Sequence, residues 1–269
     1  MIDAWNPDTF GAEITSALSE QSDLILAYYQ EDRRLLDEHL NSSPYQSLQP
    51  NRFYGRILEF HEKVLTPLLA ASRIRAWHYT RLTDGEVIDM ERQLVPSSLE
   101  FLRMRLEKLK ADALITDDEA EKIYLASPFQ TQTESRANRI WTTVVPLPPT
   151  DSGVLPLLEH WGGESSYFWL SSERITDKLK RVGAPRILEI ETALSDNLNA
   201  FRVGETVLNA WARHLGEPNS ILGCDLAISK SISSARVLRI HTEGEGVFAE
   251  VAENYPEGAG VLLKELERR

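Results

Sequence analysis

The sequence predicts an α+β fold, in which strands and helices alternate at unequal spacing. A strand-like alternation begins at residue 73, directly after a long helical region, and three helix starts with capping signals follow it. Further short apolar segments typical of strands are spread over the rest of the chain. Because the elements show no regular β-α-β repeat, we expect a mixed or antiparallel sheet with surrounding helices rather than a doubly wound sheet.

The N-terminal part of the chain is predicted to be a helical layer. From about residue 8 to residue 71, apolar residues recur at helical spacing around Leu24, Leu35 and Leu58. A stretch from residue 41 to 51, rich in Asn, Ser, Pro and Gln, interrupts this pattern. The predicted organisation is therefore a helical region over residues 1–71 and an α+β domain over residues 72–269.

The periodicity changes at Arg73 to that of a strand with two chemically different faces. His78 and Thr80 lie two residues apart, so we expect them on one face. One interpretation is structural, with both side chains satisfied within the core or at the surface. The functional interpretation is that they line a pocket and form hydrogen bonds with the ribose or amide groups of a ligand.

Three helix starts have a hydroxyl three residues before a carboxylate, which is the signature of a capping box. The pairs are Thr83 with Glu86, Ser97 with Glu100, and Thr116 with Glu119. They predict helices near 84–93, 98–111 and 117–125. The other predicted elements are a loop over 127–138, strands over 139–145, 166–170, 186–190, 221–228 and 236–240, helices over 154–160, 173–182 and 205–215, and a final helix.

Composition and charge exclude several classes of protein. The single cysteine, Cys224, rules out an internal disulfide framework, and the N-terminus has neither the basic nor the apolar region of a signal peptide. No apolar stretch is long enough to cross a bilayer, so we expect a cytoplasmic protein with no membrane partner. The net charge of −12 argues against general affinity for nucleic acid, although a local basic groove stays open.

Several familiar sites lack the residues that they require. His61-Glu62 begins like a zincin helix, but Leu65 stands where the second histidine ligand belongs. There is no phosphate-binding loop and no nucleophile elbow in the sequence, and Cys224 is expected to be a buried small residue. We therefore predict no metal site.

A second candidate segment places Glu164 directly after Gly162 and Gly163 and before an aromatic run. Glycines let the chain turn sharply, and a carboxylate held at such a turn suits the stabilisation of positive charge on a sugar. The alternative is a solvated glutamate in a turn.

The two segments together carry a resemblance to a known family. Residues 75–82, Arg-Ala-Trp-His-Tyr-Thr-Arg-Leu, resemble the His-x-Thr first strand of ADP-ribosyltransferase-fold proteins, including the DarT-type toxins. Residues 161–167, Trp-Gly-Gly-Glu-Ser-Ser-Tyr, look like the glutamate strand of a related group of uncharacterised bacterial proteins. The resemblance covers about residues 70–195. It implies an ADP-ribosyltransferase-like core in which a helix and an arginine-bearing loop precede the strand that carries the glutamate.

The resemblance also implies NAD as co-substrate and a role for each matching residue. His78 and Thr80 would contact the ribose or nicotinamide, Glu164 the 2′-hydroxyl of the nicotinamide ribose, and Arg139 or Arg136 the phosphates or the acceptor. The implied catalytic residues are Glu164 and Arg139, and the implied NAD-binding residues are His78, Tyr79, Thr80, Arg81, Arg136, Trp161 and Tyr167.

The implied function is NAD-dependent ADP-ribosylation by a bacterial toxin or phage-defence effector, with nucleic acid or protein as the acceptor and an antitoxin or other protein as a partner. The sequence has neither the Ser-Thr-Ser strand nor the paired glutamates of some members, so the acceptor type stays open. One alternative is an NAD glycohydrolase, in which water is the acceptor. Another is an inactive binding module of the same fold that contacts a partner through residues 1–71 and 215–269.

Overall fold

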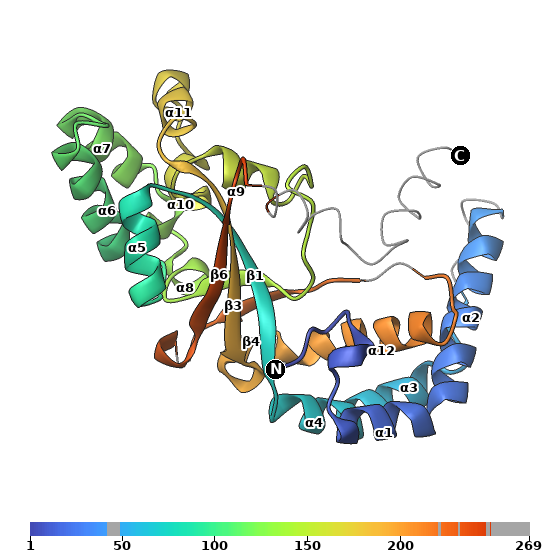
Figure 1. The fold of residues 1–269 in the computed structure, drawn as a ribbon. Coiled ribbons are helices and arrows are strands. Elements are labelled where there is room, and N and C mark those ends of the chain that lie inside the picture. The colour runs from blue at the N-terminus through green and yellow to red at the C-terminus, as the bar shows by residue number, and fades with distance from the viewer. Residues whose placement is uncertain (42–48, 220–221, 231, 246–247, 249–269) are drawn as a thin grey trace.

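The fold is built on one open, six-stranded antiparallel sheet with helices around it (Figure 1). The computed structural model describes residues 1–41, 49–219, 222–230, 232–245 and 248. The strand order is β4-β5-β2-β1-β3-β6, and each neighbouring pair is antiparallel. The strands are β1 (Arg73–Leu82), β2 (Ile140–Thr143), β3 (Ala184–Ala193), β4 (Asn197–Leu198), β5 (Asp225–Ile228) and β6 (Arg236–Thr242). The predicted α+β class with antiparallel strands is confirmed.

The central strand β1 is paired very differently on its two sides. Along β3 it is paired over its whole length, from Arg73 opposite Ala193 to Leu82 opposite Ala184. Along β2 it has a single register pair, Trp77 with Thr143. Beyond Trp77 the two strands therefore separate, and this side of β1 is left for other parts of the molecule to cover.

The N-terminal helices pack into the same core as the sheet. They comprise η1 (Pro7–Thr9), α1 (Ala12–Glu20), α2 (Ser22–Leu40), α3 (Tyr54–Phe60), a π-helical turn (His61–Leu65) and α4 (Thr66–Ala70). Leu18 and Ile25 of this layer share one hydrophobic cluster with Ile74 of β1, Leu226 of β5 and Val207 of α12 (Val203–His214). Within residues 7–41 and 49–70 the chain is thus largely helical, as predicted, while the domain boundary at residue 71 stays a prediction.

Two of the three predicted capping boxes form, whereas α6 has a simple N-cap one residue later than predicted. Thr83 caps α5 (Asp84–Arg92) and Thr116 caps α7 (Asp117–Leu125), each with its glutamate in the reciprocal bond. On α6 (Leu99–Ala111), however, Ser98 is the N-cap residue and accepts from the Phe101 amide. The prediction of Ser97 was wrong because the backbone of Ser97 pairs with residues 138 and 139, just before β2.

The segment between α7 and β2 is more helical than predicted. Instead of a continuous loop over 127–138, it contains η3 (Pro128–Gln130) and α8 (Thr133–Arg136). Ser127 caps η3 through its side chain, so the polar residues of this stretch act as caps. The remaining short elements are α9 (Leu155–Glu159), α10 (Glu164–Tyr167), α11 (Glu173–Leu179), η4 (Leu194–Asp196), η5 (Ala200–Arg202) and η6 (Ile232–Ser234).

The predicted aromatic strand over 166–170 is wrong, since the chain forms the helical turn α10 there. The Ser166 and Tyr167 amides donate to the Gly163 carbonyl, and the Phe168 amide donates to Glu164. The backbone hydrogen bonds of the turn form within the turn itself, whereas a strand would need a neighbouring strand as partner. Phe168 and Trp169 are both exposed, so their side chains do not pack in the core as those of a buried strand would. Glu164 therefore begins a helical turn and does not lie on a strand, in contrast to what the resemblance implied.

The predicted C-terminal helix lies outside the described residues. Among those residues, no helix combines the length and apolar character needed to cross a membrane.

Candidate functional site

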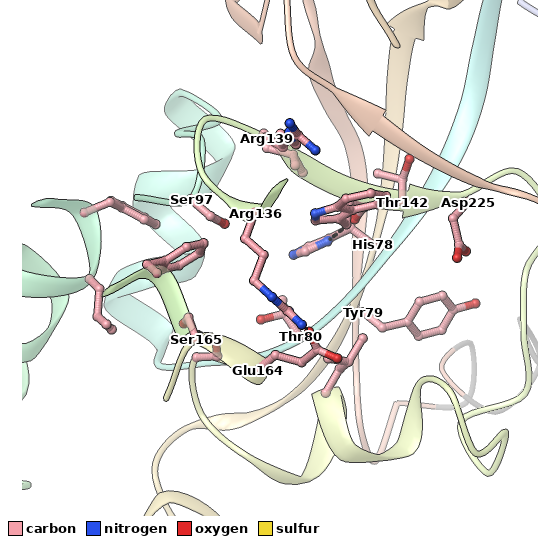
Figure 2. A pocket seen from close by; sticks show the side chains of 18 of the residues that line it. His78, Tyr79, Thr80, Ser97, Arg136, Arg139, Thr142, Glu164, Ser165 and Asp225 are labelled. Carbon is pink, nitrogen blue, oxygen red and sulfur yellow. Dashed lines mark hydrogen bonds and ion pairs between the residues drawn. The ribbon is translucent and has the colours of Figure 1, made fainter. Parts of the chain in front are cut away.

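A cavity of about 820 Å³ opens where β1 separates from β2 (Figure 2). Its walls come from β1, β2, the first turns of α6, the segment around α8, and the turn that leads into α10. Small-molecule sites in proteins are typically about 300–1,000 Å³. The cavity is therefore large enough for a ligand of nucleotide size.

His78 lies at the centre of the cavity in a defined tautomer (Figure 2). Its Nδ1 is 2.7 Å from the Trp141 carbonyl oxygen, and because a carbonyl can only accept, Nδ1 carries the proton. Burial lowers the pKa of His78 below its usual value, and the charge of Arg105 lowers it further. The neutral ring then has an acceptor at Nε2. Thr80, two residues further along β1, also lines the cavity.

Tyr79 lines the cavity and connects β1 to the segment that follows β2. Its hydroxyl donates to the Leu147 carbonyl at 3.0 Å and accepts from the Leu147 amide at 2.5 Å. The hydroxyl is thus engaged with backbone, so Tyr79 presents mainly its ring to a ligand.

Glu164 and Arg136 form an ion pair inside the cavity (Figure 2). Arg136 also donates from Nε to Gln132 Oε1 at 2.5 Å. The side chains of Glu164 and Arg136 are 42% and 26% exposed, and pairs this accessible contribute only about 0–1 kcal/mol. The pair therefore orients both groups, yet a ligand can open it at little cost.

The turn before Glu164 depends on Gly162. Its φ is +78°, and a Cβ at this position would overlap the Ser166 hydroxyl. Only glycine fits both conditions, so Gly162 permits the tight turn that brings the Glu164 carboxylate to the cavity.

Arg139 lines the cavity from the loop between α8 and β2. Its two terminal nitrogens donate to the Ser135 and Glu134 carbonyls, each at 2.6 Å. In this arrangement the Arg139 guanidinium stabilises the loop on which it lies.

Arg81 and Tyr167, both predicted to bind NAD, do not line the cavity. Arg81 donates to the carbonyls of Val182 and Gly183, each at 2.9 Å. Tyr167 stacks on His160 with their ring centroids 4.4 Å apart. Both side chains are placed to support neighbouring turns.

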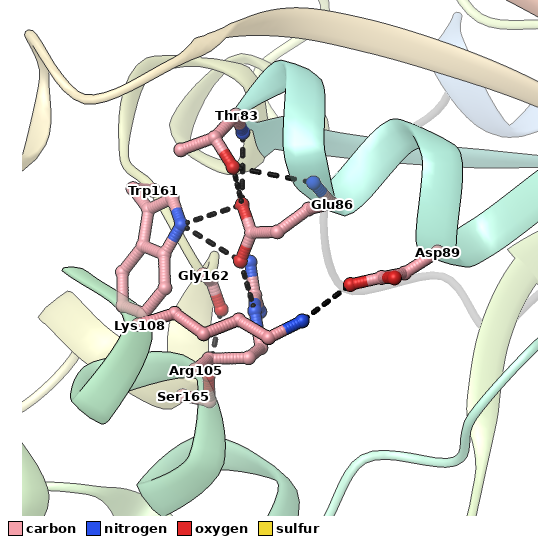
Figure 3. Close-up of polar contacts among 8 residues, drawn as sticks. All are labelled: Thr83, Glu86, Asp89, Arg105, Lys108, Trp161, Gly162 and Ser165. Atoms are coloured by element: carbon pink, nitrogen blue, oxygen red, sulfur yellow. Dashed lines mark hydrogen bonds and ion pairs between the residues drawn. The ribbon is translucent and has the colours of Figure 1, made fainter. Parts of the chain in front are cut away.

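Trp161 also lies outside the cavity, in a buried polar network (Figure 3). Its indole nitrogen donates to Glu86 at 2.9 Å, and Arg105 Nε donates to the same carboxylate at 2.6 Å. Burial raises the pKa of Glu86, but the Arg105 charge and these donors outweigh it, so the pKa is lowered. Glu86 is thus an ionised anchor between α5, α6 and the turn at Trp161.

The structure brings six of the nine predicted residues to one cavity. Those that line it are His78, Tyr79, Thr80, Arg136, Arg139 and Glu164, and those outside it are Arg81, Trp161 and Tyr167.

Among the lining residues that sequence reasoning missed are Arg105, Trp141 and Asp225. Arg105 is only 8% exposed. Its spacing from Ser98 and Leu102 would have placed it on the inward face of α6. Trp141 and Asp225 carry no comparable signal, because β2 and β5 are too short to show which face a residue occupies.

Cys224 is buried, as predicted, and burial raises the pKa of its thiol to about 11. It does not line the cavity. Within the described ranges no group of three or more His, Cys, Asp or Glu side chains could hold a metal ion.

No family model, curated protein or solved structure matches this chain. Any functional conclusion therefore depends on the chemistry of the cavity residues themselves.

Proposed function

We propose that the protein is an NAD-dependent ADP-ribosyltransferase whose active site is this cavity. The observation that supports the proposal most strongly is that His78 and Glu164 line one cavity. These two residues come from segments far apart in the sequence, yet they line the same cavity of about 820 Å³. A histidine acceptor and a carboxylate in one ligand-sized cavity are the groups that cleavage of a ribosyl bond calls for.

In this proposal Glu164 acts on the nicotinamide ribose. The bond between ribose C1′ and the nicotinamide nitrogen breaks, its electron pair leaves with nicotinamide, and positive charge develops on the sugar. The Glu164 carboxylate accepts from the 2′-hydroxyl and stabilises that charge. The acceptor then bonds to C1′ and loses its proton to solvent.

His78 and Thr80 would hold the ribose in position. The Nε2 acceptor of His78 suits a ribose hydroxyl, and the Thr80 hydroxyl can donate or accept. The exposed indole of Trp141, 42% accessible at the cavity, offers a surface on which the nicotinamide or adenine ring can stack. Arg136 keeps the Glu164 carboxylate oriented until NAD enters.

The partial exposure of Glu164 bears on the acceptor. Because its side chain is 42% exposed, a nucleobase, a protein side chain or water could approach the reacting carbon. A nucleic acid or protein acceptor would make the chain a bacterial toxin or phage-defence effector with a partner antitoxin. Water as acceptor would make it an NAD glycohydrolase. This is our second candidate, because the partial exposure of Glu164 also lets water reach the reacting carbon.

The test is an incubation of the protein with NAD carrying one label on nicotinamide and another on adenine. DNA, RNA or cell extract is supplied as acceptor, and nicotinamide release and adenine-label transfer are followed together. A transferase releases nicotinamide and labels a macromolecule, whereas a glycohydrolase releases it and yields free ADP-ribose. If the wild-type protein neither releases nicotinamide nor binds NAD, both enzymatic candidates are wrong and the inactive binding module is left.

A further inference from the structure

Arg105 is a buried cationic residue of the cavity wall whose donors are not all used. It lies on α6, is 8% exposed, and bonds through Nε to Glu86 (Figure 3). Its Nη2 is fully buried and has no hydrogen-bond partner in the part of the chain that the structure describes. Buried donors are nearly always satisfied, so a donor without a partner in the wall of a cavity is a candidate to bind an acceptor of the ligand.

A second buried donor lines the same cavity. The indole nitrogen of Trp77 on β1 also lacks a partner among the described residues, and Trp77 is 5% exposed. Arginine and tryptophan side chains donate only. Arg105 Nη2 and Trp77 Nε1 would therefore be satisfied by a ligand with several hydrogen-bond acceptors.

The helix that carries Arg105 favours an anion at this end of the cavity. Ser98, Phe101 and Leu102 line the cavity together with Arg105, so the first turns of the 13-residue α6 face the ligand space. The N-terminal end of a helix carries partial positive charge and attracts phosphate groups.

The other two arginines of the cavity are bound differently. Arg136 is paired with Glu164, and Arg139 donates from both terminal nitrogens to backbone carbonyls of its own loop. Arg105 is less exposed than either and keeps a terminal nitrogen that has no partner among the residues that the structure describes. Its charge also reaches the centre of the cavity, since it helps to lower the pKa of His78.

We infer that Arg105 is the anion-binding residue of the cavity and that it binds the pyrophosphate of the ligand. The identity of that ligand as NAD rests on the proposed function. A guanidinium held on one edge by Glu86 presents its remaining nitrogens in a fixed plane, which suits phosphate oxygens. Trp77 supplies a second donor to the same ligand.

The test compares ligands with and without the pyrophosphate. Calorimetry measures the affinities of ADP-ribose, inorganic pyrophosphate and nicotinamide riboside, the last of which has no phosphate. Because removal of Arg105 alone would leave Glu86 buried and unpaired, the main variant is the double substitution Glu86→Gln/Arg105→Met. Arg103→Met is the matched control, since Arg103 is on the same helix, has a side chain that is 40% exposed, bonds to Glu121 and does not line the cavity.

The double variant should bind ADP-ribose and pyrophosphate on the order of 10- to 100-fold more weakly, as expected for the loss of a charge-assisted bond. Its affinity for nicotinamide riboside should stay within about threefold of wild type. Arg103→Met should change none of these affinities. If the double variant fails to fold, Arg105→Lys keeps the charge but loses the planar fork, and it should weaken ADP-ribose binding about tenfold.

Unchanged ADP-ribose affinity in a folded Arg105 variant would overturn the inference. So would an equal loss for all three ligands, because that result indicates damage to the whole cavity. Nicotinamide release without any effect of Arg105 on the KM for NAD would leave the proposed function standing and the inference wrong. Conversely, Arg105-dependent binding of pyrophosphate without nicotinamide release would support the anion site and contradict the transferase.

Discussion

His78 shows how one backbone contact can define the chemistry of a side chain. The Trp141 carbonyl holds the proton on Nδ1, and burial lowers the pKa of the ring, which favours the neutral form in which the other nitrogen accepts. A solvated histidine at the same position would exchange between tautomers and donate or accept at either nitrogen. The defined tautomer is what makes His78 suitable for a ribose hydroxyl.

Replacement of His78 by alanine should weaken NAD binding while the protein still folds. A single hydrogen bond between neutral groups is worth about 0.5–1.5 kcal/mol, so the dissociation constant should rise about 2- to 13-fold. Calorimetric titration of NAD measures this change, and His39→Ala, on α2 and away from the cavity, is the control. An unchanged affinity would count against a ribose contact.

The pH dependence of NAD binding should reflect the lowered pKa of His78. In the folded protein the ring becomes protonated at a lower pH than a solvated histidine, whose pKa is about 6.5. The affinity for NAD should therefore have its midpoint below pH 6.5 and fall as the pH is lowered through it. The free energy of unfolding should also fall as the pH is lowered below 6.5, because there the unfolded chain binds a proton more readily than the folded chain does. A binding midpoint at or above pH 6.5 in calorimetric titrations would contradict this.

At the scale of elements, local sequence signals were reliable where the hydrogen bonds of an element form between residues close in sequence. The capping boxes at Thr83 and Thr116 were predictable because each joins residues three apart. The helical turn α10 was not, since Tyr167 and Phe168 favour strands by propensity, and only the absence of a neighbouring strand decides against one. That information lies in the tertiary structure.

The network around Glu86 predicts a structural role for Trp161. Trp161→Phe removes the indole donor and leaves a buried carboxylate with one bond fewer, which should cost about 1–3 kcal/mol in the free energy of unfolding. Urea denaturation measures the loss. NAD affinity should stay close to that of wild type, because Trp161 does not line the cavity.

A different pair of results would restore Trp161 to the binding site. If Trp161→Phe is as stable as wild type but binds NAD several-fold more weakly, the indole acts on the ligand and the implied cofactor role is right.

At the scale of the whole molecule, one core joins the N-terminal helices to the sheet. Leu18 of α1 is fully buried in the cluster that also contains Ile74 of β1 and Val207 of α12. The sequence indicated the helices but not this packing, because apolar spacing shows which face of a helix is buried and not what covers it.

Leu18→Ala should therefore destabilise the molecule as a unit. A buried Leu-to-Ala substitution costs about 2–5 kcal/mol, and the loss should appear in one cooperative transition. Circular dichroism at helix wavelengths and tryptophan fluorescence should report the same midpoint. Two separate transitions would instead show that residues 1–71 fold as an independent domain.

The candidate site, too, is a product of the whole fold. The sequence pointed to His78 and Glu164 separately, and their order suggested a shared pocket. The cavity that His78 and Glu164 share lies where β1 separates from β2 after Trp77, and no local sequence pattern predicts this separation. The spacing along α6 indicates that Arg105 faces inward, but not that it contacts Glu86 and Trp161 from other segments.

Nicotinamide release from NAD by wild type and by Glu164→Gln tests the account most directly. The substitution removes the charge with little change in volume, and the loss of such transition-state stabilisation should slow release by about 10²- to 10³-fold. Glu159→Gln is the matched control, because Glu159 is exposed on α9 and does not line the cavity. We predict release by wild type and the control and almost none by a folded Glu164→Gln. Equal release by all three proteins would contradict the role assigned to Glu164.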